Sequence, residues 1–134
     1  MLAKKKVLLL DDNMSVTEES IEALAKEYDV ERCKEIGIAA HRMRVYQINL
    51  FVIDLMMPPK GLKVKDEFNA GFLFYDQYVK EKYPQTPVLF WTNLNDSSYK
   101  DFMSRNKGKT WLYYLQKSED NQALLNEVNQ ILGK

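Results

Sequence analysis

Residues 50–58, which read Leu-Phe-Val-Ile-Asp-Leu-Met-Met-Pro, decide the fold class of this chain. Residues 50–53 are four consecutive apolar side chains without polar alternation, and Asp54 follows them directly. A short uninterrupted apolar run is typical of a strand buried on both faces, as in a parallel sheet that helices cover on both sides. We therefore expect a central strand here, with Asp54 at its carboxyl end.

Two kinds of segment alternate on either side of this run. The predicted strands are short and mostly apolar, and they cover residues 7–10, 28–34, 50–53, 88–91 and 111–115. The predicted helices carry apolar residues at helical spacing, and they cover residues 14–26, 37–48, 70–82, 96–106 and 121–132. The chain is therefore a strand followed by a helix, repeated five times.

This alternation predicts an α/β, flavodoxin-like (βα)5 fold with a five-stranded parallel sheet. Right-handed crossovers leave few topologies, and we expect the strand order 2-1-3-4-5. Because no linker, internal repeat or low-complexity segment interrupts the pattern, we expect one domain over residues 1–134. Ligands of such sheets bind beyond the carboxyl ends of the strands, where the strand order reverses.

Composition narrows the function classes. Lys plus Arg and Asp plus Glu both number 19, so the net charge of zero gives no electrostatic footprint for nucleic acid or an anionic membrane. The apolar runs are far shorter than the roughly 20 residues of a membrane span, and the amino terminus lacks the long apolar stretch of a secretory signal. The single cysteine, Cys33, excludes an internal disulfide and fits a cytoplasmic location.

Polar residues follow four of the predicted strands and form one candidate site: Asp11, Asp12, Asp54, Thr92 and Lys117. In a parallel sheet these strand ends share one edge, so the three carboxylates converge. They repel one another unless a cation compensates, and Mg²⁺ prefers such oxygen ligands. A carboxylate beside a cation, an ammonium and a hydroxyl can accept a phosphoryl group.

Each of these residues taken singly has a structural explanation. An acidic pair after a strand is often a turn, an aspartate at a strand end is often a helix cap, and a lone threonine or lysine there usually has no role. The functional interpretation depends on all four positions, in this chain order, at the ends of the right strands.

Four segments carry a resemblance to a known family. They are Val-Leu-Leu-Leu-Asp-Asp-Asn at 7–13, Phe-Val-Ile-Asp-Leu-Met-Met-Pro at 51–58, Val-Leu-Phe-Trp-Thr at 88–92 and Tyr-Tyr-Leu-Gln-Lys at 113–117. Together they resemble the signature segments of response-regulator receiver domains, over essentially the whole chain. The resemblance implies a phosphorylation-switched signalling domain rather than an enzyme.

The same resemblance implies roles for particular residues. Asp54 is then the phosphoacceptor, and Mg²⁺ is held directly by Asp12 and the Met56 carbonyl, with Asp11 helping through water. Thr92 and Lys117 match the switch hydroxyl and the lysine of the family. Tyr114 matches the aromatic residue that turns inward on activation.

Three features depart from the family pattern. Gly71 matches a glycine that usually follows the phosphoacceptor sooner, so residues 59–69 form an extended loop, which we expect to be mobile and which is either a tolerated insertion or a partner contact. Asn93 replaces a small residue after Thr92. Ser118 replaces a proline after Lys117, so we expect a trans Lys117–Ser118 bond, because a cis bond costs about 2.5–4 kcal/mol before a non-proline residue.

Three functions compete. In the leading one, a histidine kinase or phosphotransfer protein phosphorylates Asp54 and changes binding of an unknown downstream protein. In the alternative, suggested by Asn93 and Ser118, the chain is an interaction module that works without phosphorylation. A nucleotide or flavin enzyme is disfavoured because the acidic loop after the first strand has no glycine-rich phosphate loop, and His41, the only histidine, lies in a predicted helix.

Two further expectations concern the carboxyl terminus of the chain and the surface that would bind a partner. The chain stops shortly after the last predicted helix, so we expect a receiver that stands alone or is cut from a longer protein. The expected output surface is the fourth helix, fifth strand and fifth helix, with exposed candidates Tyr99, Lys100, Trp111 and Tyr113, although Trp111 has a core position as its alternative.

Overall fold

The computed structural model describes residues 4–11, 18–55, 70–92, 104 and 111–133. Five parallel strands form its sheet: β1 (Lys6–Leu10), β2 (Asp29–Cys33), β3 (Leu50–Ile53), β4 (Val88–Thr92) and β5 (Leu112–Gln116). Their order is β2-β1-β3-β4-β5, which confirms the flavodoxin-like topology expected from the alternation of segments.

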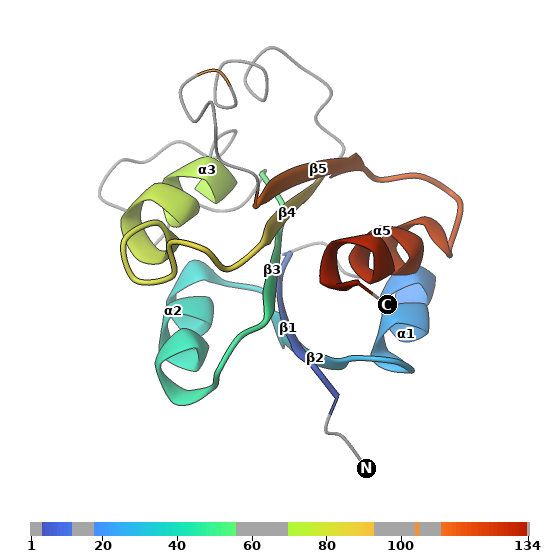
Figure 1. Ribbon diagram of the computed structural model, residues 1–134, viewed down its shortest axis with the longest axis horizontal. Helices are drawn as coiled ribbons and strands as arrows, with labels where there is room; N and C mark the ends of the chain where they lie inside the picture. Colours follow the sequence, from blue (N-terminus) through green and yellow to red (C-terminus); the bar gives the residue numbers. More distant parts are fainter. Residues whose placement is uncertain (1–3, 12–17, 56–69, 93–103, 105–110, 134) are drawn as a thin grey trace.

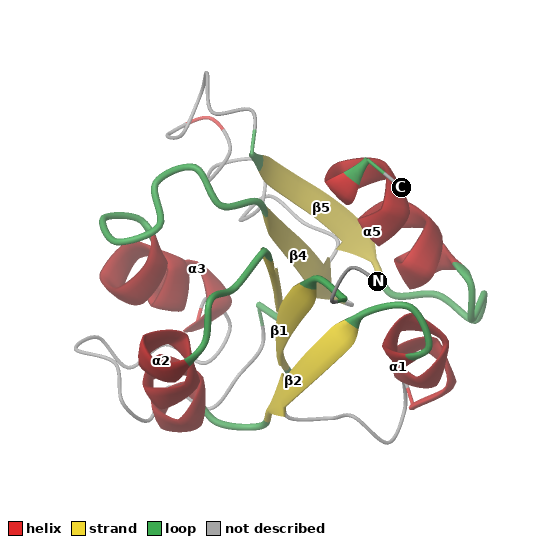
Figure 2. Cartoon of the chain, turned by 60° about the horizontal axis from the view of Figure 1, so that its bottom comes forward, coloured by secondary structure: helices red, strands yellow, loops and turns green. Residues whose placement is uncertain are grey.

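Helices cover both faces of the sheet, which gives three layers (Figure 1). The helical segments are α1 (Glu18–Ala25), α2 (Ile36–Val45), α3 (Ala70–Phe74), its continuation η1 (Tyr75–Val79) and α5 (Ala123–Leu132). Figure 1 shows α2 and α3 on one side of the strands and α1 and α5 on the other, and Figure 2 shows the same layers from below. None of the helices in the described part of the chain is long and apolar enough to cross a membrane.

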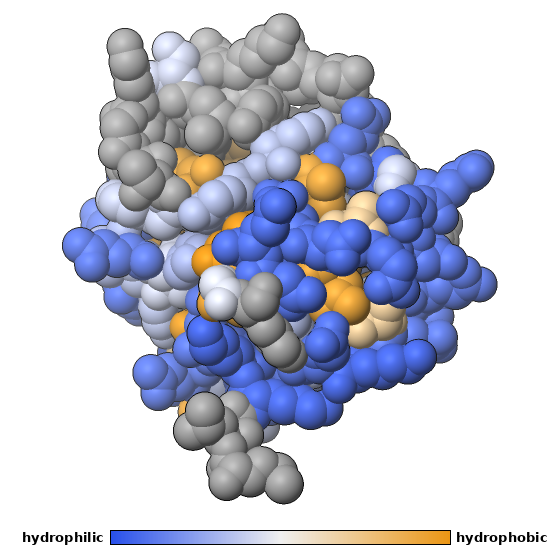
Figure 3. All heavy atoms as spheres, turned by 45° about the vertical axis from the view of Figure 1, so that its right-hand side comes forward, coloured by the Kyte–Doolittle hydropathy of each residue, from blue (hydrophilic) through white to orange (hydrophobic). Residues whose placement is uncertain are grey.

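Alternation along the strands divides the core into two clusters. Leu8, Leu10 and Phe51 point toward α2 and α3, whereas Val7 and Leu9 point toward α1 and α5. All four residues of β3 are fully buried, as expected for a strand covered on both faces. Over the second cluster, the outer surface around α1 and α5 is mostly hydrophilic, and apolar atoms show only in limited areas (Figure 3).

Several helix ends differ from the prediction. The structure describes α1 only from Glu18, since residues 14–17 lie outside the described residues. The predicted helix over residues 37–48 ends at Val45, because Tyr46 adopts an extended conformation, with φ −115° and ψ 150°. Asn49 then exchanges two hydrogen bonds with Lys6, of 2.8 and 2.9 Å, which leads the chain into β3. Asn49 and Lys6 are far apart in the sequence, so the local sequence pattern could not predict these hydrogen bonds.

The predicted helix over residues 70–82 is not a regular α-helix throughout. From Tyr75 it becomes π-helical, and the Lys80 N–H donates to the Tyr75 carbonyl at 2.9 Å, five residues back along the chain. Tyr75 and Val79 are both buried. The expected helix over residues 96–106 lies outside the described residues except for Ser104, which is helical.

Candidate functional site

Backbone hydrogen bonds place four of the predicted site residues at one edge of the sheet. Asp11 and Asp54 directly follow β1 and β3, and the Asp54 N–H donates to the Leu10 carbonyl at 2.9 Å. Thr92 is the last residue of β4, and its carbonyl accepts a hydrogen bond of 2.8 Å from the Lys117 N–H. The rule that parallel strands share their carboxyl edge therefore predicted correctly that these four residues lie at one edge of the sheet.

The centre of the site is a lysine between two carboxylates. The Lys117 Nζ lies 2.7 Å from Asp11 Oδ2 and 3.1 Å from Asp54 Oδ2. The side chains of Lys117, Asp11 and Asp54 are only 6%, 1% and 8% exposed, so water screens these charges weakly. We refer to these three residues as the Asp54 cluster.

The Asp54 cluster carries a net negative charge, because two carboxylates face one ammonium. Burial raises the pKa of the Asp54 carboxyl, and the neighbouring Asp11 charge raises it further. The Lys117 charge, together with hydrogen bonds from Thr92 and Lys117, opposes this rise in the pKa. Thr92 is fully buried, and its side chain forms a hydrogen bond with Asp54.

The donor set fits a hard divalent cation. Asp11 and Asp54 supply buried carboxylate oxygens, and one ammonium leaves a negative charge that a cation would offset. Within the described residues, no group of three or more His, Cys, Asp and Glu side chains could hold a metal ion. The two remaining predicted ligands, Asp12 and the carbonyl of Met56, lie outside the described residues.

The Lys117–Ser118 bond is trans, as predicted, since the described residues contain no cis peptide bond. The Lys117 ammonium still reaches Asp54 at 3.1 Å. Proline is therefore not required after Lys117 for this contact. Asn93 lies outside the described residues.

The predicted switch and output residues are only partly described. Tyr114 is half-buried and packs against the cluster under α2 and α3. Tyr113 was expected to be exposed but is half-buried, because it packs on the cluster under α1 and α5. Trp111, for which a core position was the alternative, is also half-buried and packs on the cluster under α2 and α3. Tyr99, Lys100 and the loop of residues 59–69 lie outside the described residues.

Two contacts of the site were not predicted from the sequence: those of Trp91 and Gly71. The Lys117 Nζ lies 5.0 Å from the centroid of the Trp91 ring, which was assigned only to an apolar run. Gly71, at the start of α3, packs against the backbone of Asp54 and Leu55. The alternation of side chains along a strand could have predicted that Trp91 lies near Lys117. Trp91 of β4 pairs with Leu115 of β5, and Lys117 follows Leu115 by two residues, so its side chain lies on the same face of the sheet. No local signal gives the approach of Gly71.

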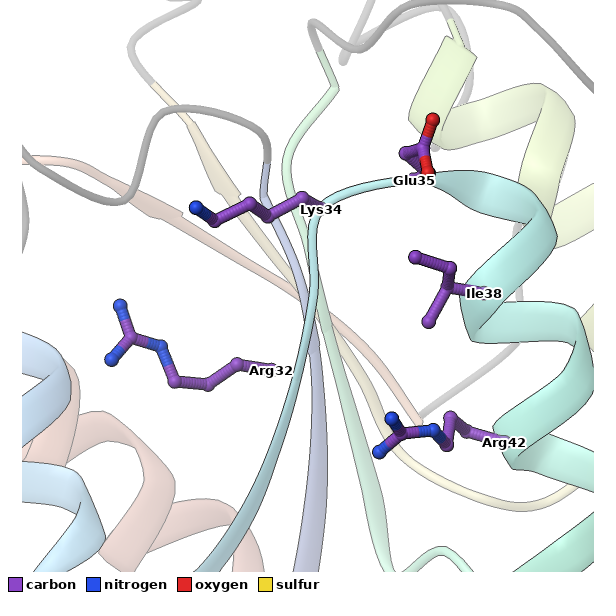
Figure 4. Close-up of a pocket in the computed structure, with 5 residues that line it drawn as sticks. All are labelled: Arg32, Lys34, Glu35, Ile38 and Arg42. Atoms are coloured by element: carbon purple, nitrogen blue, oxygen red, sulfur yellow. The ribbon is translucent and has the colours of Figure 1, made fainter.

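A separate surface hollow lies between the end of β2 and α2 (Figure 4). It is lined by Arg32, Lys34, Glu35, Ile38 and Arg42. Ion pairs already engage two of its cations, because Arg32 binds Glu18 at 2.6 Å and Arg42 binds Glu31. The hollow includes no residue of the Asp54 cluster. His41 is exposed on α2, as a surface histidine would be.

Comparisons with solved structures identify the fold. A CheY-like response regulator receiver domain protein from Methanospirillum hungatei JF-1 superimposes with a TM-score of 0.76 at 17% identity, over 98% of this chain and 95% of that one. The chemotaxis response regulator CheY4 of Vibrio cholerae gives 0.74 at 23% identity, over 96% and 99%. The BeF3-activated receiver domain of DrrB, from Thermotoga maritima, gives 0.72 at 19% identity, over 99% and 100%.

No family model matches the sequence, and no curated protein matches it. The likeness therefore lies in the arrangement of the elements, which is that of CheY-like response-regulator receiver domains over nearly the whole chain. Such low identities establish the fold and leave the chemistry to be argued from the site.

Proposed function

We propose that this chain is a phosphoacceptor signalling domain in which Asp54 takes a phosphoryl group from a histidine kinase or phosphotransfer protein. The observation that carries the proposal is the Lys117 ammonium held within 3.1 Å of the buried Asp54 carboxylate, with the Thr92 hydroxyl on the same carboxylate. These are the groups that a transferred phosphoryl group needs around it. The receiver fold supports the proposal, since domains of this fold are signalling modules.

The transfer uses Asp54 as a nucleophile. One of its carboxylate oxygens attacks the phosphorus of a phosphohistidine, the phosphorus–nitrogen bond breaks, and the imidazole leaves with the electron pair and takes up a proton from solvent. Negative charge on the three phosphoryl oxygens is balanced by the Lys117 ammonium, and the Thr92 hydroxyl donates to one of these oxygens.

Mg²⁺ is the cofactor that this site would hold. Asp11, Asp12, Asp54 and the Met56 carbonyl are the proposed ligands, and the ion would neutralise charge on the phosphoryl oxygens. The negative charge left on the Asp54 cluster gives the reason for a cation at this position.

The proposed output is a change in the binding of a downstream protein. Thr92 and Tyr114 lie on the neighbouring strands β4 and β5, so a new bond from the Thr92 hydroxyl to a phosphoryl oxygen can alter the packing of Tyr114. The proposal places the domain in the cytoplasm, where histidine kinases present their phosphoryl groups, and assigns it neither nucleic acid nor membrane as a partner.

Labelling with a small phosphoryl donor tests the proposal. The protein is incubated with acetyl phosphate and Mg²⁺, and intact-mass spectrometry detects the addition of one phosphoryl group. Asp54→Asn should abolish this labelling, and the matched control Asp76→Asn, at an exposed carboxylate of η1, should label as the wild type does. The two variants should give the same far-ultraviolet circular dichroism.

The alternative is an interaction module of receiver fold that works without phosphorylation. The sequence departures at Asn93 and Ser118 favour it, although Ser118 leaves Lys117 in contact with Asp54. A wild-type protein that takes no phosphoryl label from either acetyl phosphate or a phosphohistidine donor would support the alternative and reject the proposal.

A further inference from the structure

Trp91 lies beneath the ammonium of the Asp54 cluster. The Lys117 Nζ is 5.0 Å from the centroid of the Trp91 ring, and Trp91 is only 3% exposed. β4 pairs Trp91 with Leu115 of β5, and alternation brings the Lys117 side chain to the same side of the sheet two residues later. Asp11 and Asp54 reach that side as well, since the one ammonium contacts both.

The Trp91 ring restricts the position of the Lys117 ammonium more than the two carboxylates alone would. A lysine ammonium ends a flexible four-carbon chain, so contacts with two carboxylates alone leave several side-chain conformations open. The negative face of an indole attracts a cation, and the attraction is larger where water is excluded. At 6% exposure the Lys117 side chain is nearly free of water. Trp91 therefore adds a third contact that restricts the ammonium, beside those with the two carboxylates.

We propose that Trp91 is a positioning residue, which holds the Lys117 ammonium against Asp54 and so sets the rate at which Asp54 accepts a phosphoryl group. This inference rests on the proposed function. In the assay reaction, an Asp54 oxygen forms a bond to the phosphorus of acetyl phosphate while the bond from phosphorus to the acetate oxygen breaks, and acetate leaves with the electron pair. Trp91 acts through Lys117 and touches none of the reacting atoms.

The first experiment compares initial labelling rates with acetyl phosphate and Mg²⁺. Trp91→Met removes the ring but fills much of its space with a flexible side chain, and it should slow labelling about tenfold. Trp91→Phe keeps a smaller ring and should slow it about two- to threefold. The control Leu115→Ala removes packing beside Trp91 without removing the ring, and it should label at the wild-type rate. Circular dichroism checks that each variant is folded.

The second experiment needs no phosphorylation. Urea unfolding of Trp91→Met, Lys117→Met and the double variant gives a double-mutant cycle. The unfolding constant of the double variant should be about tenfold smaller than the product of the single effects predicts, because both single changes remove the same contact. The coupling factor is the ratio of the unfolding constant expected from the product of the single effects to the one measured for the double variant. If Trp91 only fills the core, this factor should be near one.

The outcomes separate the inference from the proposed function. Wild-type protein that is never labelled rejects the proposed function, and the unfolding cycle still decides whether Trp91 holds Lys117. Wild-type protein that is labelled, together with Trp91→Met at the wild-type rate or a coupling factor of one, overturns the role of Trp91. If Trp91→Met does not fold, Trp91→Phe carries both measurements, and labelling by that variant at the wild-type rate overturns it equally.

Discussion

Replacing Gly71 with alanine should destabilise the fold at the point where α3 meets the end of β3. A Cβ on Gly71 would collide with the Asp54 carbonyl oxygen, and it would lie 2.8 Å from the Leu55 Cα and 3.0 Å from the Asp54 carbonyl carbon. All three atoms belong to the backbone, so no side chain can turn aside to make room. The Gly71 N–H also donates to the Leu55 carbonyl at 3.0 Å, which holds the two segments together.

The size of the effect follows from these contacts. Non-bonded carbon atoms prefer separations of about 3.5–4.0 Å, so α3 or the end of β3 must move by about 1 Å. Such overpacking costs about 1–3 kcal/mol, and weakening the Gly71–Leu55 hydrogen bond costs up to about 1 kcal/mol. Alanine is better than glycine inside a helix by about 0.5–1 kcal/mol. With each range taken at its middle, the free energy of unfolding should fall by about 2 kcal/mol.

Gly37 provides the matched control. It lies in α2, and a Cβ at this position would meet no atom within 4 Å. Gly37→Ala should therefore raise the free energy of unfolding by about 0.5–1 kcal/mol. Urea unfolding followed by far-ultraviolet circular dichroism measures both variants. Labelling of Asp54 by acetyl phosphate should slow in Gly71→Ala, where the colliding carbonyl is that of Asp54, and should be unchanged in Gly37→Ala.

Two results would refute this reasoning. A Gly71→Ala variant as stable as the wild type would mean that α3 does not approach the backbone of Asp54 closely enough to exclude a Cβ. Equal losses in Gly71→Ala and Gly37→Ala would show that both effects come from helix propensity and not from contact with the backbone of β3.

Three more predictions follow from the site and the core. Because burial raises the folded-state pKa of Asp54 above its value of about 3.9 in the unfolded chain, the folded state binds the proton more tightly, and the contribution of Asp54 to wild-type stability should fall as pH rises above about 4. Asp54→Asn removes this titration, so its stability advantage in urea should grow with pH, and a constant advantage would contradict the pKa shift. Lys117→Met leaves buried carboxylates without their counter-ion and should cost about 3–5 kcal/mol in urea unfolding; a loss under 1 kcal/mol would mean that the ion pairs are screened. Mg²⁺ should raise the melting temperature of the wild type more than that of Asp12→Ala, and equal shifts would remove Asp12 from the ligand set. 

Local sequence patterns carried much of the fold and of the site. The uninterrupted apolar run of residues 50–53 predicted β3 with its observed bounds, because a strand buried on both faces needs no polar positions. The alternation of strands and helices predicted the strand order, and the rule for parallel strand ends then brought Asp11, Asp54 and Lys117 together. These predictions depend only on periodicity and on the direction of the chain, both of which can be read locally.

The tertiary structure decided where elements end and which neighbours a site residue has. α2 ends at Val45 rather than at residue 48, and the helix that begins at Ala70 turns π-helical at Tyr75, because contacts across the sheet and the core outweigh weak local preferences. The Lys117 ammonium lies over the Trp91 ring, and Gly71 packs against the backbone of Asp54. Such distances depend on how separate strands and helices are brought together, and no window of sequence contains both partners.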